Sequence, residues 1–145
     1  GMGPGESYVD SKAASIMGIY ENTVDGMMTD YVFPQENGHH EQVKWFRIGD
    51  GKDGLLCKME EKLGLNLANY TDENLEKAQH PFEIEKADDV IIHLDYRQSG
   101  LGSNSCGEEQ LEENKVKLQD FAMAFTVQAA ECGTEIRKAR KQYID

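Results

Sequence analysis

The chain has 145 residues, of which 39% are hydrophobic and 29% charged, so it can build a real core and is not a disordered chain. Its 15 lysines and arginines against 27 aspartates and glutamates give a net charge of −12. This balance argues against nucleic acid and against an anionic membrane surface as partners. No apolar run reaches the roughly 20 residues of a membrane span, and no signal-peptide pattern begins the sequence.

The three cysteines lie far apart, and no Cys-x-x-Cys pair occurs: they are Cys57, Cys106 and Cys132. An odd count at this spacing matches neither a zinc site nor a closed disulfide framework. We therefore expect a reducing compartment, the cytoplasm, and no metal site.

Fourteen glycines against three prolines, most of the glycines between short apolar runs, are typical of turns in an antiparallel β protein. Strands are predicted over residues 43–48, 55–59, 63–67 and 90–96. The last of these is the clearest, because its alternate residues are apolar. Near the C-terminus, the apolar residues of 116–118 and 121–127 have opposite phases. Two such strands require a bulge or tight turn between them, at Gln119–Asp120.

Thr71 followed by Asp72 and Glu73 predicts the start of a helix that ends before Pro81. Residues 131–145 are predicted to form a helical tail, whose basic residues at 137–141 dock on the acidic body or bind a partner. The fold class is thus mainly β, with one or two short helices, in a single domain over residues 1–145.

Residue chemistry alone reveals no enzyme. His39 and His40 lie near Glu36 and Glu41, but adjacent histidines on a loop do not converge on a metal by default, so we interpret this segment as a solvated loop. His93 is interpreted as a packing or surface residue of its strand. No P-loop, Rossmann fingerprint or nucleophile elbow occurs, so we name no catalytic residue and no metal ligand.

Four sequence motifs occur along the chain, and their occurrence together in this order is a specific signal. They are residues 3–12 (GPGESYVDSK), 31–38 (YVFPQENG), 70–80 (YTDENLEKAQH) and 94–107 (LDYRQSGLGSNSCG). Together they resemble the signature of the C-terminal, small-chain domain of glycoside hydrolase family two β-galactosidases, and the match spans residues 3–127. The chain resembles the C-terminal half of that domain, with Met2 standing where the family has arginine, as expected if a reading frame starts inside the motif.

The resemblance implies an antiparallel β-sandwich that is part of a galactose-mutarotase-like supersandwich. The family hydrolyses terminal β-D-galactosides with retention. Its catalytic glutamates and its magnesium ligands lie on a barrel that this chain lacks, so we expect no cofactor in this chain and no activity from it alone. The expected role is assembly with the rest of a β-galactosidase chain and a loop at the rim of the active site.

The resemblance also suggests site residues in that loop. Gly100, Gly102 and Gly107 are expected to shape it through positive φ. The rim residues are expected to be Ser103, Asn104 and Cys106, the last at a position where some members carry a sugar-stacking tryptophan.

A sheet cut from its sandwich exposes edges and an apolar face, so we expect self-association or cover by the tail. Two other hypotheses stay open. One is a free-standing carbohydrate-binding module of mutarotase-like fold that binds a galactoside or another sugar through the same loop. The other is an independent enzyme, such as a mutarotase, that pairs His39, His40 or His93 with a glutamate.

Overall fold

The structure, a computed structural model, describes residues 1–101 and 109–131. Contacts group the chain into two compact units. Unit 1 comprises residues 1–43 and 62–121, and unit 2 comprises residues 44–61 and 122–145. The assignment of one domain over 1–145 stays a prediction.

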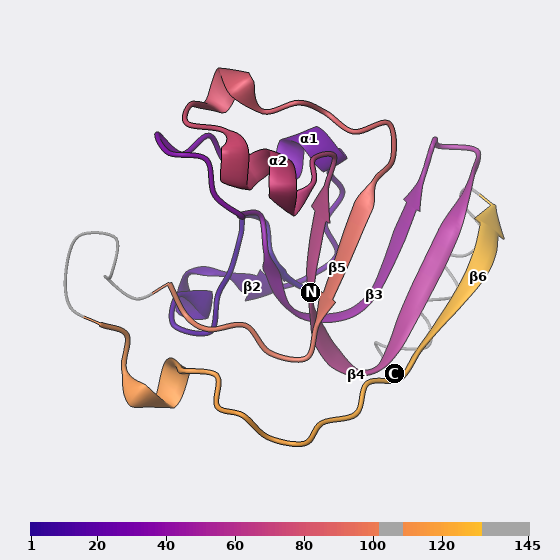
Figure 1. The fold of residues 1–145 in the computed structure, drawn as a ribbon. Helices are drawn as coiled ribbons and strands as arrows, with labels where there is room; N and C mark the ends of the chain where they lie inside the picture. Colours follow the sequence, from indigo (N-terminus) through magenta and orange to yellow (C-terminus); the bar gives the residue numbers. More distant parts are fainter. Residues whose placement is uncertain (102–108, 132–145) are drawn as a thin grey trace. The chain divides into compact units, whose positions relative to one another are not determined.

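The described residues are mainly β, with antiparallel strand pairs and two short α-helices (Figure 1). This confirms the predicted fold class and fits a β-sandwich. The elements are β1 Met2–Gly3, η1 Lys12–Ala14, β2 Ile16–Met17, α1 Val24–Met27, β3 His40–Gly49, β4 Asp53–Ala68, α2 Asp72–Lys77, η2 Pro81–Glu83, β5 Ile91–Asp95, η3 Glu112–Asn114 and β6 Phe125–Glu131, where η marks a 3-10 turn. No helix among these described residues is long and apolar enough to cross a membrane.

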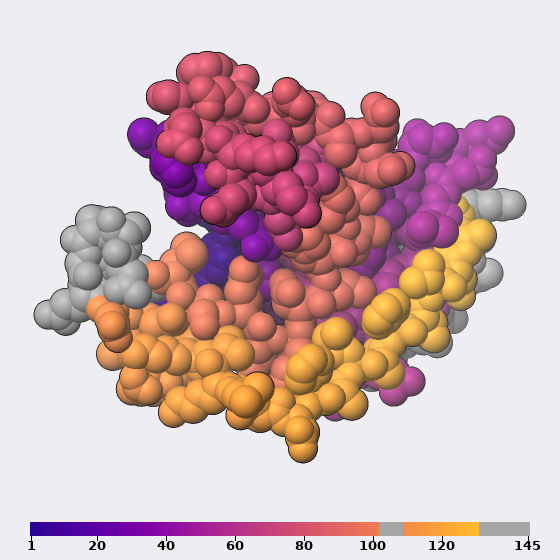
Figure 2. Space-filling model, viewed as in Figure 1, coloured from indigo at the N-terminus to yellow at the C-terminus, as the bar shows by residue number. Residues whose placement is uncertain are grey.

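In unit 1, the end of β4 pairs with β5 in the register Gly64↔Asp95 to Ala68↔Ile91, and β1 pairs with β2. The strand predicted at 90–96 is therefore confirmed. Residues 109–121 lie against the segment that follows β5 (Figure 2), where Gly100 N–H donates to the Asn114 carbonyl at 3.2 Å. These contacts place the chain on either side of residues 102–108 within one unit.

The helix predicted after Thr71 is confirmed as α2. The Thr71 hydroxyl accepts from the backbone N–H of Asn74 at 3.2 Å, which caps the first turn. Leu75 packs with Ala68 and Tyr70 in a small buried cluster. The helix ends at Lys77, earlier than expected, and Pro81 begins η2 instead.

In unit 2, β4 pairs with β6 in the register Asp53↔Glu131 to Met59↔Phe125. The glycine-rich turn before β4 closes on the Asp50 carboxylate, which accepts from the backbone N–H groups of Lys52 and Asp53 at 2.9 Å each. Gly51 in this turn has φ +93°, a conformation that favours glycine.

The strands predicted at 55–59 and 63–67 are confirmed, but they form one element, because β4 continues from its pairing with β6 into its pairing with β5. One strand prediction is wrong. Residues 116–118 form no strand: the Val116 N–H donates to the Ser99 hydroxyl at 3.2 Å, and Leu118 is fully exposed. Consequently no bulge is needed at Gln119–Asp120. The predicted helical tail falls on residues 132–145, outside the described part, except for Glu131, which ends β6.

Candidate functional site

The start of the predicted rim loop is fixed by Asp10. Its Oδ1 accepts from the backbone N–H of Leu101 at 3.2 Å. A Cβ added to Gly100 would lie 2.4 Å from Asp10 Oδ2, so the carboxylate itself requires a glycine there. The expected positive φ at Gly100 is wrong, because among the described glycines only Gly38 and Gly51 have it. Close approach, not left-handed backbone, explains this glycine.

The other predicted loop residues lie outside the described part of the chain. They are Gly102, Ser103, Asn104, Cys106 and Gly107. The structure describes only the residues at which this loop begins, Gly100 and Leu101.

Glu6 joins two of the four sequence motifs. Its Oε2 accepts from the Gly38 N–H at 2.9 Å and from the Tyr8 hydroxyl at 3.0 Å, and its Oε1 accepts from the Tyr31 hydroxyl. The bond to Glu6, followed by burial, raises the pKa of Tyr31 to about 12. Burial and Glu6 likewise raise the pKa of Tyr8. Both phenols therefore remain protonated donors at neutral pH.

The segment 35–38 is held from its other side by Asn66 of β4. Asn66 is 2% exposed, and its amide donates to the Asn37 carbonyl at 2.8 Å. Gly38 follows with φ +77°, and a Cβ there would lie 2.5 Å from the Met27 carbonyl oxygen. The motif thus takes glycine at this position for both backbone and steric reasons.

His39 is not part of a solvated loop, as the sequence had suggested; its side chain is 1% exposed. Its Nε2 bonds Glu41 Oε1 at 3.2 Å, and its Nδ1 lies 3.5 Å from Asp95 Oδ2. Its ring stacks on Tyr8, with 5.5 Å between ring centroids. A Cβ on Gly64 would lie 2.2 Å from His39 Cε1. We call these five residues the His39 cage.

The cage holds a charged imidazole at neutral pH. Burial lowers the pKa of His39, but the carboxylates of Asp95 and Glu41 outweigh burial and raise it to about 9. A buried imidazolium between two carboxylates stabilises the fold only while it is protonated. This role of His39 is not visible in the sequence, because Asp95 comes from β5 and Gly64 from β4, both far from His39 along the chain.

The other two candidate histidines, His40 and His93, also have structural partners. His40 Nδ1 donates to the Met2 carbonyl at 2.9 Å, and burial lowers the pKa of His40. His93 Nδ1 lies 3.1 Å from Glu36 Oε1, at the surface of the sheet. Neither pair lines one of the hollows found among the described residues. The hypothesis of a histidine–glutamate enzyme therefore gains no cleft from these two pairs, and His39 is itself buried in its cage.

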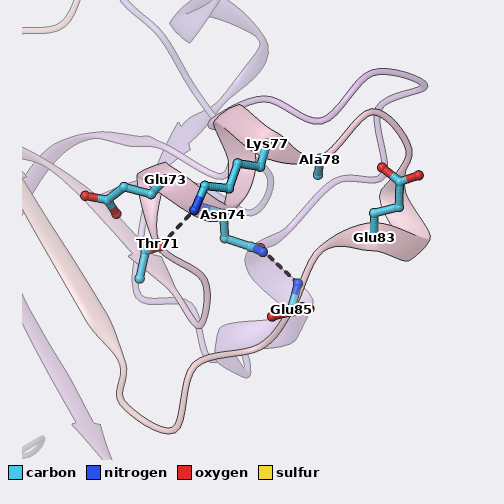
Figure 3. A pocket seen from close by; sticks show the side chains of 7 residues that line it. All are labelled: Thr71, Glu73, Asn74, Lys77, Ala78, Glu83 and Glu85. Carbon is cyan, nitrogen blue, oxygen red and sulfur yellow. Dashed lines mark hydrogen bonds between the residues drawn. The ribbon is translucent and has the colours of Figure 1, made fainter.

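One hollow, of about 490 Å³, lies beside α2 (Figure 3). Two of its polar side chains are used in local hydrogen bonds: the Asn74 side chain accepts from the Glu85 N–H at 2.9 Å, and Glu83 Oε2 accepts from the Gln79 N–H at 2.7 Å. Residues 1–101 and 109–131 also contain no group of three side chains placed to hold a metal ion.

Comparison with known proteins gives consistent results. Residues 1–127 match the family described as beta galactosidase small chain. The chain is 34% identical over 125 residues to a β-galactosidase of Actinobacillus pleuropneumoniae, covering 86% of this chain and 12% of the relative. It is 31% identical over 126 residues to one from Kluyveromyces lactis (86% and 12%) and 29% identical over 136 residues to one from Arthrobacter sp. (90% and 13%). The chain therefore spans only about an eighth of the length of these relatives.

Proposed function

Because the chain belongs to the β-galactosidase small-chain family, we propose that it is a C-terminal β-sandwich segment that supports the hydrolysis of terminal β-D-galactosides in a full enzyme. It does so by assembling with the rest of that enzyme and by presenting the loop after Gly100 at the rim of the active site. In this account the catalytic groups and magnesium belong to the other segments. The sandwich is of the galactose-mutarotase-like type.

The observation that carries the proposal is the way three of the four motifs converge in unit 1. Glu6 of the first motif binds the second through Gly38 and Tyr31, and Asp10 of the first binds the fourth through Leu101. Most of this bonding sets the position of backbone rather than presenting reactive groups. An arrangement of this kind suits a segment that positions a loop for chemistry supplied elsewhere.

The assembly role is supported by an apolar face of unit 2. Leu55, Cys57 and Met59 of β4 stand opposite Ala129, Val127 and Phe125 of β6 and share one face of the sheet. Leu55, Phe125 and Val127 are 45%, 46% and 55% exposed, whereas Cys57 and Met59 on the same face are buried. The exposed apolar part of this face, Leu55, Phe125 and Val127, suits a covering partner, which we assign to the rest of a β-galactosidase chain. In isolation, we expect the face to drive self-association.

Light scattering of the isolated chain over a concentration series tests the assembly role. We expect Val127→Ser to weaken self-association about fivefold or more, because each copy loses apolar contact area. The matched control is Thr126→Ser, whose side chain lies on the opposite face of β6. A clean monomer, or an equal effect of both substitutions, would argue against this face as the contact.

The rim-loop role is tested in a β-galactosidase of a relative whose matching segment is replaced by residues 1–127. In that enzyme, Asp10→Asn removes the charge that holds the Leu101 N–H. We expect a roughly fivefold lower kcat/KM for a β-galactoside, because the neutral amide oxygen of asparagine accepts the same hydrogen bond more weakly than a carboxylate does. Asp30→Asn, at an exposed position, is the control and leaves the constant unchanged. Unchanged kinetics in Asp10→Asn would refute the rim-loop role.

We also propose a cytoplasmic location. The odd number of cysteines and the buried, free thiol of Cys57 support it, because secreted proteins of this size usually pair their cysteines. Fractionation of the source cells is the corresponding test, and recovery of the protein outside the cytoplasm would contradict it.

A further inference from the structure

Unit 1 contains a second hollow, of about 350 Å³. Residues of η1, of the start of β3, of the middle of β4 and of the segments after β5 and η3 line it together. We call it the basic hollow, and its charged lining residues are Lys12, Glu41, Lys62, Arg97, Glu113 and Lys115. Cations outnumber acids here, although the whole chain carries a net charge of −12.

Two of these charged groups are paired within the protein. Lys115 Nζ lies 2.9 Å from Glu109 Oε2 and 2.6 Å from Glu112 Oε1. Glu41 is paired with the buried His39 at 3.2 Å, and His39 also pairs with Asp95 at 3.5 Å, so the negative charge of Glu41 is compensated only in part. Lys115 therefore adds little positive charge to the hollow.

Three cations remain available. Lys12 and Arg97 form no ion pair with any residue of the described ranges 1–101 and 109–131, and Lys62 Nζ reaches only the neutral Gln42 Oε1 at 3.3 Å. The other acid in the described lining, besides Glu41, is Glu113, which is exposed. Uncompensated lysine and arginine side chains in one concavity attract anions.

Arg97 is also held in place. Its guanidinium carbon lies 5.7 Å from the centre of the Tyr96 ring, and that ring stacks on Phe121 at 5.0 Å between centroids. A guanidinium on an aromatic platform loses less conformational entropy when it binds a carboxylate or phosphate than a free side chain does.

Two further observations fall on the same hollow. Gln42, in β3, has φ +57° and is the non-glycine residue with positive φ in the described part of the chain, a strained conformation of the kind that concentrates at binding sites. Gln98 Oε1 is buried without a hydrogen-bond partner. An acceptor left unpaired in a lining residue needs a donor such as a hydroxyl group of a ligand.

We propose that the basic hollow binds a small hydroxylated anion, a monosaccharide that carries a carboxylate or a phosphate. Lys12, Lys62 and Arg97 bind the anionic group, and Gln98 Oε1 accepts from a hydroxyl. The volume is at the lower end of small-molecule sites and suits one sugar ring. The described lining residues do not belong to the loop after Gly100, and the titration below tests this proposal without reference to the proposed function.

Calorimetric titration of the full chain with galacturonate, galactose 6-phosphate, inorganic phosphate and galactose tests the proposal. We expect saturable binding of at least one of the two charged sugars, and the tighter one identifies the anionic group. Galactose and inorganic phosphate should each bind at least tenfold more weakly, since galactose lacks the anionic group and phosphate lacks the sugar hydroxyls. Binding should weaken as salt is raised. Failure of both charged sugars to bind, or equal affinity for galactose or for inorganic phosphate, would overturn the proposal.

Substitutions locate the site. Arg97→Gln and Lys12→Gln should each weaken binding about tenfold, the effect of one charge-assisted hydrogen bond, and Gln98→Leu should weaken it less. Lys52→Gln, in the exposed turn before β4, is the charge-matched control. Because Arg97 is exposed and Lys12 half-exposed, these variants should keep the amide spectrum of the parent. An equal loss in Lys52→Gln, or no loss in Arg97→Gln, would refute the assignment.

Discussion

The His39 cage predicts that the chain becomes less stable as the pH rises through the weakly alkaline range. The pKa of His39 is raised from 6.5 to about 9 in the folded chain. A group whose folded pKa is raised contributes its full stability below the unfolded pKa and loses it as the pH approaches the folded value. The cage therefore stabilises the fold at neutral pH and ceases to do so near pH 9.

The size of the effect follows from the folded and unfolded pKa values of His39. A tenfold change in a protonation equilibrium corresponds to about 1.4 kcal/mol, so between pH 7.0 and 8.5 the free energy of unfolding should fall by about 2 kcal/mol. This is a large part of the 5–15 kcal/mol of a typical domain. Two other buried groups titrate outside this pH range. Burial lowers the pKa of His40, so His40 titrates below the range. Burial raises the pKa of the Cys57 thiol from 9.0, so the thiol titrates above the range.

Urea unfolding at closely spaced pH values measures this slope. The control is His39→Gln, which removes the titrating group but keeps a polar side chain between Asp95 and Glu41. We expect the slope between pH 7.0 and 8.5 to disappear in the variant, whatever its absolute stability. A slope that persists unchanged in His39→Gln, or a parent chain that gains stability with rising pH, would refute the reasoning.

Two further predictions concern the packing of the same region. Gly64→Ala should destabilise the chain by about 2 kcal/mol or more in thermal unfolding, because the new Cβ would lie 2.2 Å from His39 Cε1. The control is Gly5→Ala, where no atom lies within 4 Å of the new Cβ and stability should change by less than about 1 kcal/mol. Equal destabilisation by both substitutions would contradict the packing of the His39 cage. Tyr31→Phe should lower the free energy of unfolding in urea by about 1–2 kcal/mol, because it removes a hydrogen bond to the Glu6 carboxylate. A variant as stable as the parent would show that this hydrogen bond does not stabilise the fold.

The elements predicted correctly are those whose signals are local. Thr71 with two acids in the next turn fixes the start of α2, and alternation over 90–96 fixes β5. The apolar residues at 116–118 also suggest a strand, but a strand needs a partner as well as a pattern. In the described structure the Val116 N–H bonds a side chain, Ser99, so the pattern alone is misleading.

The binding and buried groups depend on contacts that no local pattern reveals. His39 resembles a loop residue in the sequence, and only the pairing of β4 with β5 brings Asp95 and Gly64 beside it. The glycine requirement at Gly100 has the same origin, since the approaching group is Asp10 from the first motif. In both cases the contacting residue lies far away in the sequence, so no local pattern indicates the contact.

The most direct test of the central claim replaces the matching segment of the Actinobacillus pleuropneumoniae β-galactosidase with residues 1–127 of this chain. At 34% identity over 125 residues, a segment that performs the same role should give an assembled enzyme that hydrolyses a nitrophenyl β-galactoside. The isolated chain and the enzyme lacking the segment should both be inactive. A soluble, assembled hybrid without hydrolysis, or hydrolysis that is equally fast when the segment is absent, would contradict the account.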